Sequence, residues 1–540
     1  METPRWARWL VGANLVGLAI AGAWLATRDT PAPDDAVDTE KPSFLIIMPD
    51  TLRGDRVGAV RDGQPVTPNI DALAAKGARF THMYSQSGWT LPALAAFLSG
   101  RWPLAPTESK AQALDFMRSD QMTMPELLTA AGYNTAVFWG PGISEAAPEF
   151  SRGFVHVGKE EGTDFSAGVL SWLTEADRRP FFAVVHNTDL QFPSAAIPGR
   201  YETPSPNTSL EPVYAQLASQ VGPEQAAATV AAAYDAVVTR YDAAIGRMVA
   251  GLQKAGLDDD TVVMVTSNHG VDLGERGHYF HGTVYDTNLH VPLVVYDPKM
   301  EGGRTVDTVV QTLDLAPTLF ARAGIAPPEG LPGASILPLL GLADGTYPER
   351  PVFSLCSTGS MSIRTPAYKV ARVAPKDNPA NARIQAFDLA ADPGELHELT
   401  GALPPEAGAL RDQLATWWAA REAELAQVRP SGRDSTALKQ ALKDNGYWGM
   451  VNGDGSGTAG KAMPGGGITA PDGGKSAAGA PSPNGPPPSA RPPNASPPNA
   501  PPPNAGKGGP VGPPGVYPPP PGQALATPPP VSGAPGGGAK

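Results

Sequence analysis

Residues 44–50, FLIIMPD, form a short apolar run that ends in a proline and a carboxylate. An unbroken run of this kind predicts a β-strand buried on both faces, because a half-exposed strand alternates apolar with polar side chains. Asp50 stands directly after the predicted strand, where parallel sheets carry their functional sites. The pattern fits a metal ligand at Asp50 and a turn or helix N-cap residue equally well.

Similar apolar runs recur along the chain between segments with helical spacing. The other predicted strands of this region are 135–139, 180–185 and 261–266, and the predicted helices are 68–80, 124–131 and 226–255. Strands that alternate with helices indicate an α/β fold, with a mostly parallel central sheet sandwiched by helices. A smaller C-terminal α+β section is expected, with strands near 351–355 and 367–373, a loop at 375–384 and a helix at 404–428.

The N-terminus has the composition of an export segment. Arg5 and Arg8 precede an uncharged run at 9–26, which as a helix would span about 27 Å, close to the bilayer core of about 30 Å. Basic residues before the run predict that the rest of the chain lies outside the cytoplasm. Residues 1–28 are thus expected to be a signal-anchor, or a cleaved signal peptide since residues 21–23, AGA, resemble a cleavage site. Both interpretations predict an exported, periplasmic or otherwise extracytoplasmic protein, and the anchor predicts an inner-membrane tether.

Composition divides the remainder of the chain. A linker at 29–40 precedes a core at 41–345, a smaller C-terminal subdomain at 346–445, and a tail at 446–540. The tail is rich in Pro, Gly and Asn and has little apolar material to bury, which predicts disorder. The net charge of −12 argues against a nucleic-acid partner, since binding to the phosphate backbone needs clustered Lys and Arg. The single cysteine, Cys356, cannot form an internal disulfide.

Two further segments carry residues suited to chemistry. Residues 87–100, SGWTLPALAAFLSG, predict a turn followed by an apolar helix, with Thr90 near the start of that helix. A hydroxyl there faces a field that favours anions, although it could also simply cap the helix. Residues 266–282 contain Asn268, His269, His278 and His281, and thus three of the eight histidines of the chain. This concentration indicates metal ligands or proton-transfer groups.

In its order of motifs, the chain resembles the sulfatase family of the alkaline phosphatase superfamily over about residues 42–400. The blocks that carry the resemblance are PSFLIIMPDTLRGDRVG (42–58), VTPNIDALAAKGARFTHMYSQS (66–87), GWTLPALAAFLSGRWP (88–103), MPELLTAAGYNTAVF (124–138), YDAAIGRMVAGLQKAGLDDDTVVMVTSNHG (241–270), HGTVYDTNLHVPLVV (281–295), QTLDLAPTLFARAGI (311–325) and FDLAADPGELHEL (387–399).

The resemblance implies a role for several residues. It places Thr90 at the position of the nucleophile, and it implies one divalent metal ion (Ca, Mg, Mn or Zn). The implied roles are metal ligation for Asp50, Asn268 and His269, catalysis for His281 and His278 beside Thr90, and substrate binding for Arg53, His186 and Gln191. For Arg53 a salt bridge with Asp55 is the favoured alternative.

Departures from the family pattern bear on the chemistry. Standard sulfatases convert the first residue of a Cys/Ser-x-Pro-x-Arg signal into formylglycine, whereas residues 90–94 read TLPAL, so formylglycine chemistry is excluded. Thr51 stands where a second Asp often follows the first, and Asn268 stands where the downstream pair commonly begins with Asp. The loss of carboxylates should weaken the binding of a hard dication. Gln191 replaces the last His of the family's middle motif.

Together these features predict a metal-dependent hydrolase of anionic esters that uses Thr90 as nucleophile. Phosphate- or phosphonate-type esters are the first expectation for the substrate and sulfate esters the second, carried either by a small molecule or by a cell-envelope glycan or lipid. One alternative is a catalytically degenerate binding protein that keeps the sulfatase fold. The other is a phosphoryl head-group transferase.

Overall fold

The computed structural model describes residues 41–427 apart from 105–116, 118–119, 141–142, 144–146, 160–164, 176–179, 189, 191–209, 357–358 and 375–380. The expected signal segment and linker, the candidate Gln191 and the expected tail lie outside the described residues. Among the described helices, none combines the length and the apolar character needed to cross a membrane.

The central sheet contains nine of the described strands, in the order β12-β4-β11-β8-β1-β7-β5-β6 with β13 beside β4. Their bounds are β1 (Ser43–Ile47), β4 (Ala78–Tyr84), β5 (Asn134–Trp139), β6 (His156–Lys159), β7 (Phe181–His186), β8 (Thr261–Val265), β11 (His290–Tyr296), β12 (Arg304–Val306) and β13 (Val310–Gln311). Strand β11 runs antiparallel to β4 and β8, and the other pairs are parallel. The predicted mostly parallel sheet is confirmed.

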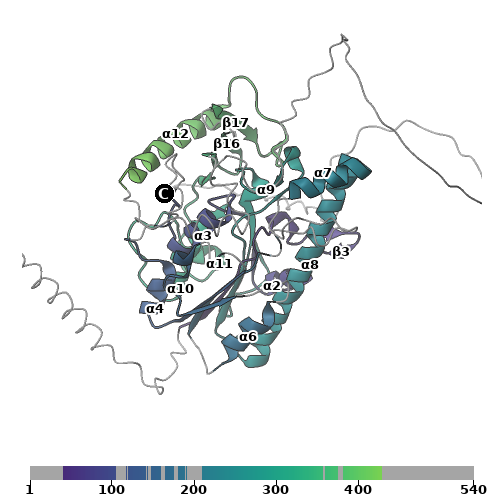
Figure 1. The fold of residues 1–540 in the computed structure, drawn as a ribbon. Coiled ribbons are helices and arrows are strands. Elements are labelled where there is room, and N and C mark those ends of the chain that lie inside the picture. Colours follow the sequence, from purple (N-terminus) through teal and green to yellow (C-terminus); the bar gives the residue numbers. More distant parts are fainter. Residues whose placement is uncertain are drawn as a thin grey trace, which may run out of the picture. The chain divides into compact units, whose positions relative to one another are not determined.

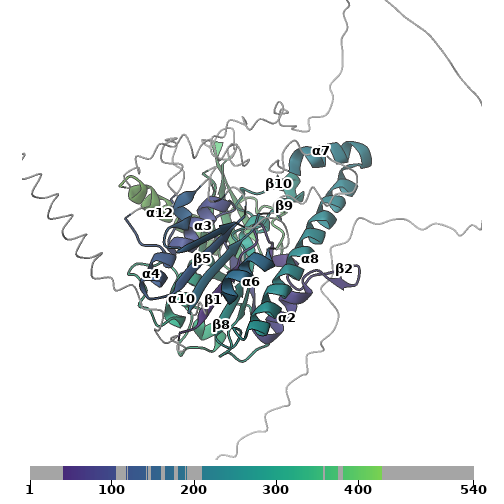
Figure 2. The same cartoon turned by 60° about the horizontal axis from the view of Figure 1, so that its bottom comes forward.

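Helices cover both faces of the sheet (Figures 1 and 2). One face packs against α3 (Thr90–Ser99), α4 (Met124–Ala130) and α10 (Leu315–Arg322), and the other against α2 (Pro68–Lys76), α6 (Ser166–Thr174) and α8 (Pro223–Ala255). The apolar run of β1 supplies both cores, because successive side chains of a strand point to opposite faces. Phe44 belongs to the first core and Leu45 to the second.

The helix expected at 68–80 is shorter in the structure. It ends at Lys76, and β4 begins two residues later at Ala78. The reason lies at Gly77, where a Cβ atom would come within 2.1 Å of the carbonyl oxygen of Val295. Gly77 therefore lets the chain pass directly against β11 and change from helix to strand.

The C-terminal section is an antiparallel sheet with one long helix. Its strands, in sheet order, are β14 (Val352–Leu355), β15 (Met361–Arg364), β16 (Tyr368–Val373) and β17 (Arg383–Asp388), and α12 (Pro405–Leu425) packs on it. The expected α+β character is confirmed. Strand β17 begins inside the stretch expected to be a loop. The boundaries at 345 and 445 stay predictions.

Shorter elements connect these parts. They are η1 (Gly54–Arg56), β2 (Val60–Arg61), β3 (Gln64–Pro65), η3 (Pro148–Ser151), α7 (Leu210–Val221), β9 (Asp272–Leu273), η6 (Glu275–Gly277), β10 (Tyr279–Phe280), α9 (Asp286–Leu289), η7 (Thr312–Asp314) and α11 (Leu337–Leu340).

Candidate active site

The candidate site lies at the carboxyl edge of three neighbouring parallel strands. In register, Ile47 of β1 pairs with Val185 of β7 on one side and with Val265 of β8 on the other. The residues that follow these three positions therefore meet at one edge of the sheet. Asp50 follows β1, and its backbone N–H donates to the carbonyl of Asn187 beyond β7 at 2.8 Å.

Thr90 reaches this edge from the start of α3. Its Oγ1 lies 3.3 Å from Oδ2 of Asp50 and 3.0 Å from Nε2 of His269. Thr90 is the first residue of the helix, Trp89 is its N-cap, and no side chain caps it. The capping alternative for Thr90 is therefore wrong. Its hydroxyl instead joins two functional groups whose side chains are fully buried.

The tautomer of His269 follows from its second ring nitrogen. Nδ1 lies 2.7 Å from the carbonyl oxygen of Gly270, and a carbonyl only accepts, so Nδ1 carries the proton. Nε2 then presents a lone pair to the hydroxyl of Thr90. An imidazole fixed in this way by a backbone carbonyl is the usual arrangement of a histidine that binds a metal.

Burial sets the charge of the site. It raises the pKa of Asp50 to about 7, against hydrogen bonds from Asn268 and Thr90 that lower it. Burial also lowers the pKa of His269 to about 4 and that of His186 to about 3. The imidazoles are therefore neutral at pH 7, and only Asp50 can bring a negative charge.

The donor set fits a divalent cation. Oδ1 of Asp50 lies 3.3 Å from Nε2 of His269, so two acceptor lone pairs face each other in a buried place. Oδ1 has no hydrogen-bond partner in the described part of the chain. A cation beside both atoms would turn their repulsion into attraction. The amide oxygen of Asn268 is a third ligand of suitable type, but it accepts from the N–H groups of His269 and Thr51, so it would have to release the longer bond, from Thr51 at 3.3 Å, to contact a cation. Within the described ranges, no group of three or more His, Cys, Asp or Glu residues lies close enough together to hold a metal ion. The candidate ligands Asp50, Asn268 and His269 therefore differ from such a site in that one of the three is an amide and only Asp50 is a carboxylate.

Two further candidate histidines join the cluster. The ring of His281 lies 4.6 Å, between centroids, from the ring of His269 and 3.9 Å from that of Phe280. His186, the last residue of β7, places Nε2 3.3 Å from Nδ2 of Asn268. The structure thus brings together six of the nine candidates: Asp50, Thr90, His186, Asn268, His269 and His281.

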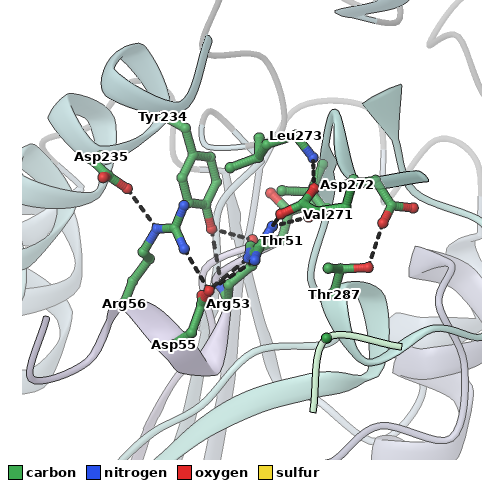
Figure 3. A network of polar contacts seen from close by, with 12 residues as sticks. Thr51, Arg53, Asp55, Arg56, Tyr234, Asp235, Val271, Asp272, Leu273 and Thr287 are labelled. Carbon is green, nitrogen blue, oxygen red and sulfur yellow. Dashed lines mark hydrogen bonds and ion pairs between the residues drawn. The ribbon is translucent and has the colours of Figure 1, made fainter. Parts of the chain in front are cut away.

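Two candidates lie elsewhere, which corrects the roles expected for them. The guanidinium of Arg53 pairs with Asp55 at 2.8 Å (Figure 3), so the salt-bridge alternative is confirmed. It also pairs with Glu275 at 2.6 Å, and these contacts lend the substrate-binding interpretation no support. His278 is exposed at the turn before β10, and its ring lies 6.2 Å from that of Tyr285 rather than against Thr90. Its expected catalytic role is not supported.

Other residues of the site escaped the sequence analysis. The hydroxyl of Ser267 accepts from the N–H of Leu52 at 2.9 Å and donates to the carbonyl of Pro49 at 2.7 Å, so it fixes the turn that carries Asp50. Its position directly before the candidate ligand Asn268 could have identified Ser267 as a site residue. Cys356 is buried and its Sγ donates to the carbonyl of Gly282 at 2.8 Å, directly after His281.

Comparison with known proteins decides the family. A family model described as "Sulfatase" matches residues 42–325, more than half of the chain. The chain belongs to the sulfatase family. A second model of a sulfatase-type segment, "N-sulphoglucosamine sulphohydrolase, C-terminal", matches residues 274–416. The predicted family and the predicted class, a hydrolase of esters, are both confirmed.

Individual sulfatases match over most of their length. An ulvan-active sulfatase of Formosa agariphila is 26% identical over 456 residues, which cover 74% of this chain and 84% of that protein. A choline-sulfatase of Rhizobium meliloti is 26% identical over 489 residues, covering 76% and 93%. The solved structure of a phosphonate monoester hydrolase of Agrobacterium radiobacter aligns with a TM-score of 0.51 at 20% identity, over 71% of this chain and 96% of that one, and thus has the same fold.

Proposed function

We propose that this sulfatase-family hydrolase cleaves sulfate or phosphonate-type esters with the hydroxyl of Thr90 as its nucleophile. The observation that carries the proposal is the position of Oγ1 at the N-terminus of α3, 3.0 Å from Nε2 of His269 and 3.3 Å from Oδ2 of Asp50. A hydroxyl is a weak nucleophile unless a neighbouring group takes its proton. Here two acceptors stand within reach, and the helix N-terminus favours the anionic substrate.

Asp50, Asn268 and His269 would hold one divalent cation. When bound, the cation would lower the pKa of the attacking hydroxyl and neutralise the charge of an ester oxygen. The residues also orient one another, because the amide oxygen of Asn268 accepts from the N–H of His269 at 2.8 Å and from the N–H of Thr51 at 3.3 Å.

The reaction would proceed in two displacements. Oγ1 of Thr90 attacks sulfur or phosphorus while Asp50 accepts its proton, and the bond to the alcohol oxygen breaks. The leaving oxygen then takes this proton from Asp50, and His281, neutral and buried, supplies a hydrogen bond to that oxygen from its ring N–H. A water molecule then attacks the same sulfur or phosphorus while Asp50 takes one of its protons. The bond to Oγ1 breaks, sulfate or phosphonate is released, and Asp50 passes that proton to Thr90.

The relatives guide the choice of substrate. Ulvan-active sulfatase and choline-sulfatase are named for sulfate esters, and a structural neighbour is named for phosphonate monoesters. These ester groups share a tetrahedral centre and a single negative charge. A divalent cation held by one carboxylate, that of Asp50, keeps one net positive charge, which matches the single negative charge of these esters.

The test compares the full-length chain with Thr90→Ala on aryl sulfate, aryl phosphonate and aryl phosphate esters, with and without added Mn²⁺, Zn²⁺, Ca²⁺ or Mg²⁺. We expect loss of kcat/KM by about a thousandfold or more, as for other nucleophile deletions. Thr174→Ala, on the exposed side of α6, is the matched control and should keep full activity. A Thr90→Ala protein with wild-type activity would rule out this nucleophile.

Chelation separates the cation from the nucleophile. We expect EDTA to abolish turnover and the correct ion to restore it. If EDTA leaves the rate unchanged while Thr90→Ala abolishes it, the cation is not needed and Asp50 and His269 suffice to activate the hydroxyl of Thr90. If no ester is cleaved although the chain binds a metal, the degenerate binding protein is the correct interpretation, which the missing carboxylates at Thr51 and Asn268 favour.

The location of the enzyme is also a proposal. Arg5 and Arg8 before the apolar run at 9–26 support an extracytoplasmic, membrane-tethered enzyme. Fusion of residues 1–40 to a reporter that is active only outside the cytoplasm should give an active, membrane-associated reporter. Activity in the soluble fraction alone would indicate a cleaved signal peptide, and an inactive reporter would contradict export.

A further inference from the structure

The residue after the candidate carboxylate has a strained backbone. Thr51 has φ of +63°, in the left-handed region that β-branched residues avoid. Such a conformation persists only where surrounding contacts hold it in place. Because Thr51 follows Asp50 directly, whatever holds Thr51 also fixes the direction of the carboxylate.

One side chain bonds to the peptide groups on both sides of this turn. The hydroxyl of Tyr234 donates to the carbonyl of Thr51 at 2.7 Å and accepts from the N–H of Arg53 at 3.0 Å (Figure 3). Tyr234 comes from the middle of α8 and is fully buried. Both bonds therefore lie away from water, where their loss would leave two buried backbone groups without a partner.

Neighbouring contacts fasten the same turn to α8. The guanidinium of Arg56 lies 5.4 Å above the ring of Tyr234, and its Nε is 2.6 Å from Oδ1 of Asp235. On the other side, Nη1 of Arg53 donates to the carbonyl of Val271, two residues beyond His269, at 3.1 Å. The turn is thus held between the long helix and the segment that carries His269.

We propose that Tyr234 is a positioning residue that holds the strained turn at Thr51 and thereby orients Asp50 toward Thr90. The consequence for catalysis rests on the proposed function, but the restraint on the turn does not. The phenol suits this task because one group supplies both the donor and the acceptor, and α8 gives it a rigid base. Removing its oxygen leaves the ring in place and frees the turn.

The experiment compares Tyr234→Phe with Tyr241→Phe in the full-length chain. Tyr241 lies two turns further along α8, is equally buried and packs on Phe165, so it is a matched control. Amide hydrogen exchange over residues 48–56 should accelerate about tenfold or more in Tyr234→Phe and stay unchanged in Tyr241→Phe. We expect kcat to fall about tenfold to a hundredfold with little change in KM, as for other residues that orient metal ligands.

A second substitution separates positioning from general destabilisation. Glycine adopts positive φ without strain, so Thr51→Gly relieves the turn of its need for restraint. In the Thr51→Gly chain, Tyr234→Phe should accelerate amide exchange over residues 48–56 clearly less, and lower kcat clearly less, than it does in the wild-type chain. If Tyr234→Phe alone does not fold, the double variant should fold. The proposal would be overturned if Tyr234→Phe changed the exchange rate and kcat equally in the wild-type and Thr51→Gly chains. It would also be overturned if the double variant did not fold although Thr51→Gly does, or if exchange at 48–56 stayed unchanged in Tyr234→Phe.

The outcomes also separate this inference from the proposed function. If Tyr234→Phe accelerates exchange in a chain that cleaves no ester, the restraint of the Thr51 turn by Tyr234 is supported and the proposed reaction is contradicted. If exchange is unchanged in an active enzyme that depends on Thr90, the proposed reaction is supported and the restraint is contradicted.

Discussion

The hydroxyl of Thr90 and the imidazole of His269 meet although 179 residues separate them in the chain. Sequence reasoning predicted this meeting because both positions belong to blocks that resemble one family, and because Asp50 and His269 each follow a buried strand. For Arg53 it favoured the salt bridge with Asp55, which is confirmed, but it did not foresee the second partner, Glu275. His278 lies exposed before β10, where the sequence analysis expected a catalytic group. Sequence reasoning could not find Tyr234, because a tyrosine on the buried face of a helix has the same pattern as any core residue.

Asn268 offers a test of the cation at single-residue scale. Asn268→Asp adds a carboxylate to a set that has one, so a hard dication should bind about tenfold more tightly or better. Isothermal titration with Mn²⁺ and Ca²⁺ measures the change. Asn134→Asp, on the exposed first residue of β5, is the control and should leave affinity unaltered. Equal affinity for wild type and Asn268→Asp would mean that residue 268 is not a ligand.

Among the elements, the central strands β1, β5, β7 and β8 and the long helix α8 were predictable from apolar periodicity, but the strands β4 and β11 and the contacts between elements were not. The helix at 68–76 and the strand at 78–84 read as one segment in the sequence, because the close approach of Gly77 to Val295 is invisible there. The antiparallel direction of β11 was also unforeseen. That direction depends on how the segment 281–289 crosses the edge of the sheet, and periodicity does not report it.

The turn before α3 is packed against the segment that carries His281. A Cβ atom on Gly88 would come within 2.0 Å of the carbonyl oxygen of Thr283, and the carbonyl of Gly88 accepts from the N–H of Gly282 at 2.7 Å. Gly88→Ala should therefore separate the two elements, lower the free energy of unfolding by about 1–3 kcal/mol and reduce kcat.

Thermal unfolding and steady-state kinetics would measure both effects of Gly88→Ala. Gly408→Ala is the control, because it lies inside α12 with nothing within 4 Å of the added atom. It should be neutral or slightly stabilising. A Gly88→Ala enzyme with the unfolding temperature and kcat of the wild type would contradict the close packing.

For the whole molecule, a buried ionic cluster joins the C-terminal sheet to the core. Lys369 of β16 is fully buried, with Nζ 2.6 Å from Asp286 of α9 and 2.7 Å from Glu395. The α+β character of this section was predictable from its apolar runs. The ion pairs were not, since their partners lie far apart in the chain.

Within the cluster, Asp286 gives the fold a dependence on acid pH, whereas burial raises the pKa of Glu395, which contributes in the opposite sense. Burial raises the pKa of Asp286, but the charges of Lys369 and Arg364 outweigh it and lower that pKa from 3.8 to about 2. A carboxyl with a lowered pKa stabilises the fold fully above its ordinary value, and this contribution is lost as the pH falls through about 2. Urea unfolding between pH 7 and pH 2 should show the loss.

Asp286→Asn should remove this part of the pH dependence and, at pH 7, lower the free energy of unfolding by about 3 kcal/mol, since the buried Lys369 loses one of its two carboxylate partners. Asp412→Asn, whose side chain is exposed on α12, is the control and should match the wild type. A wild-type pH profile in Asp286→Asn would place the acid sensitivity elsewhere.

The position of Cys356 allows the opening of the segment that carries His281 to be measured by thiol labelling. The thiol is buried behind the carbonyl that follows His281, and the sequence contains no second cysteine. A thiol-reactive dye can therefore modify the chain at one place, and only in molecules in which this region has opened. Its labelling rate, followed with and without substrate analogues, would measure how often the segment beside the candidate active site opens in the unaltered protein.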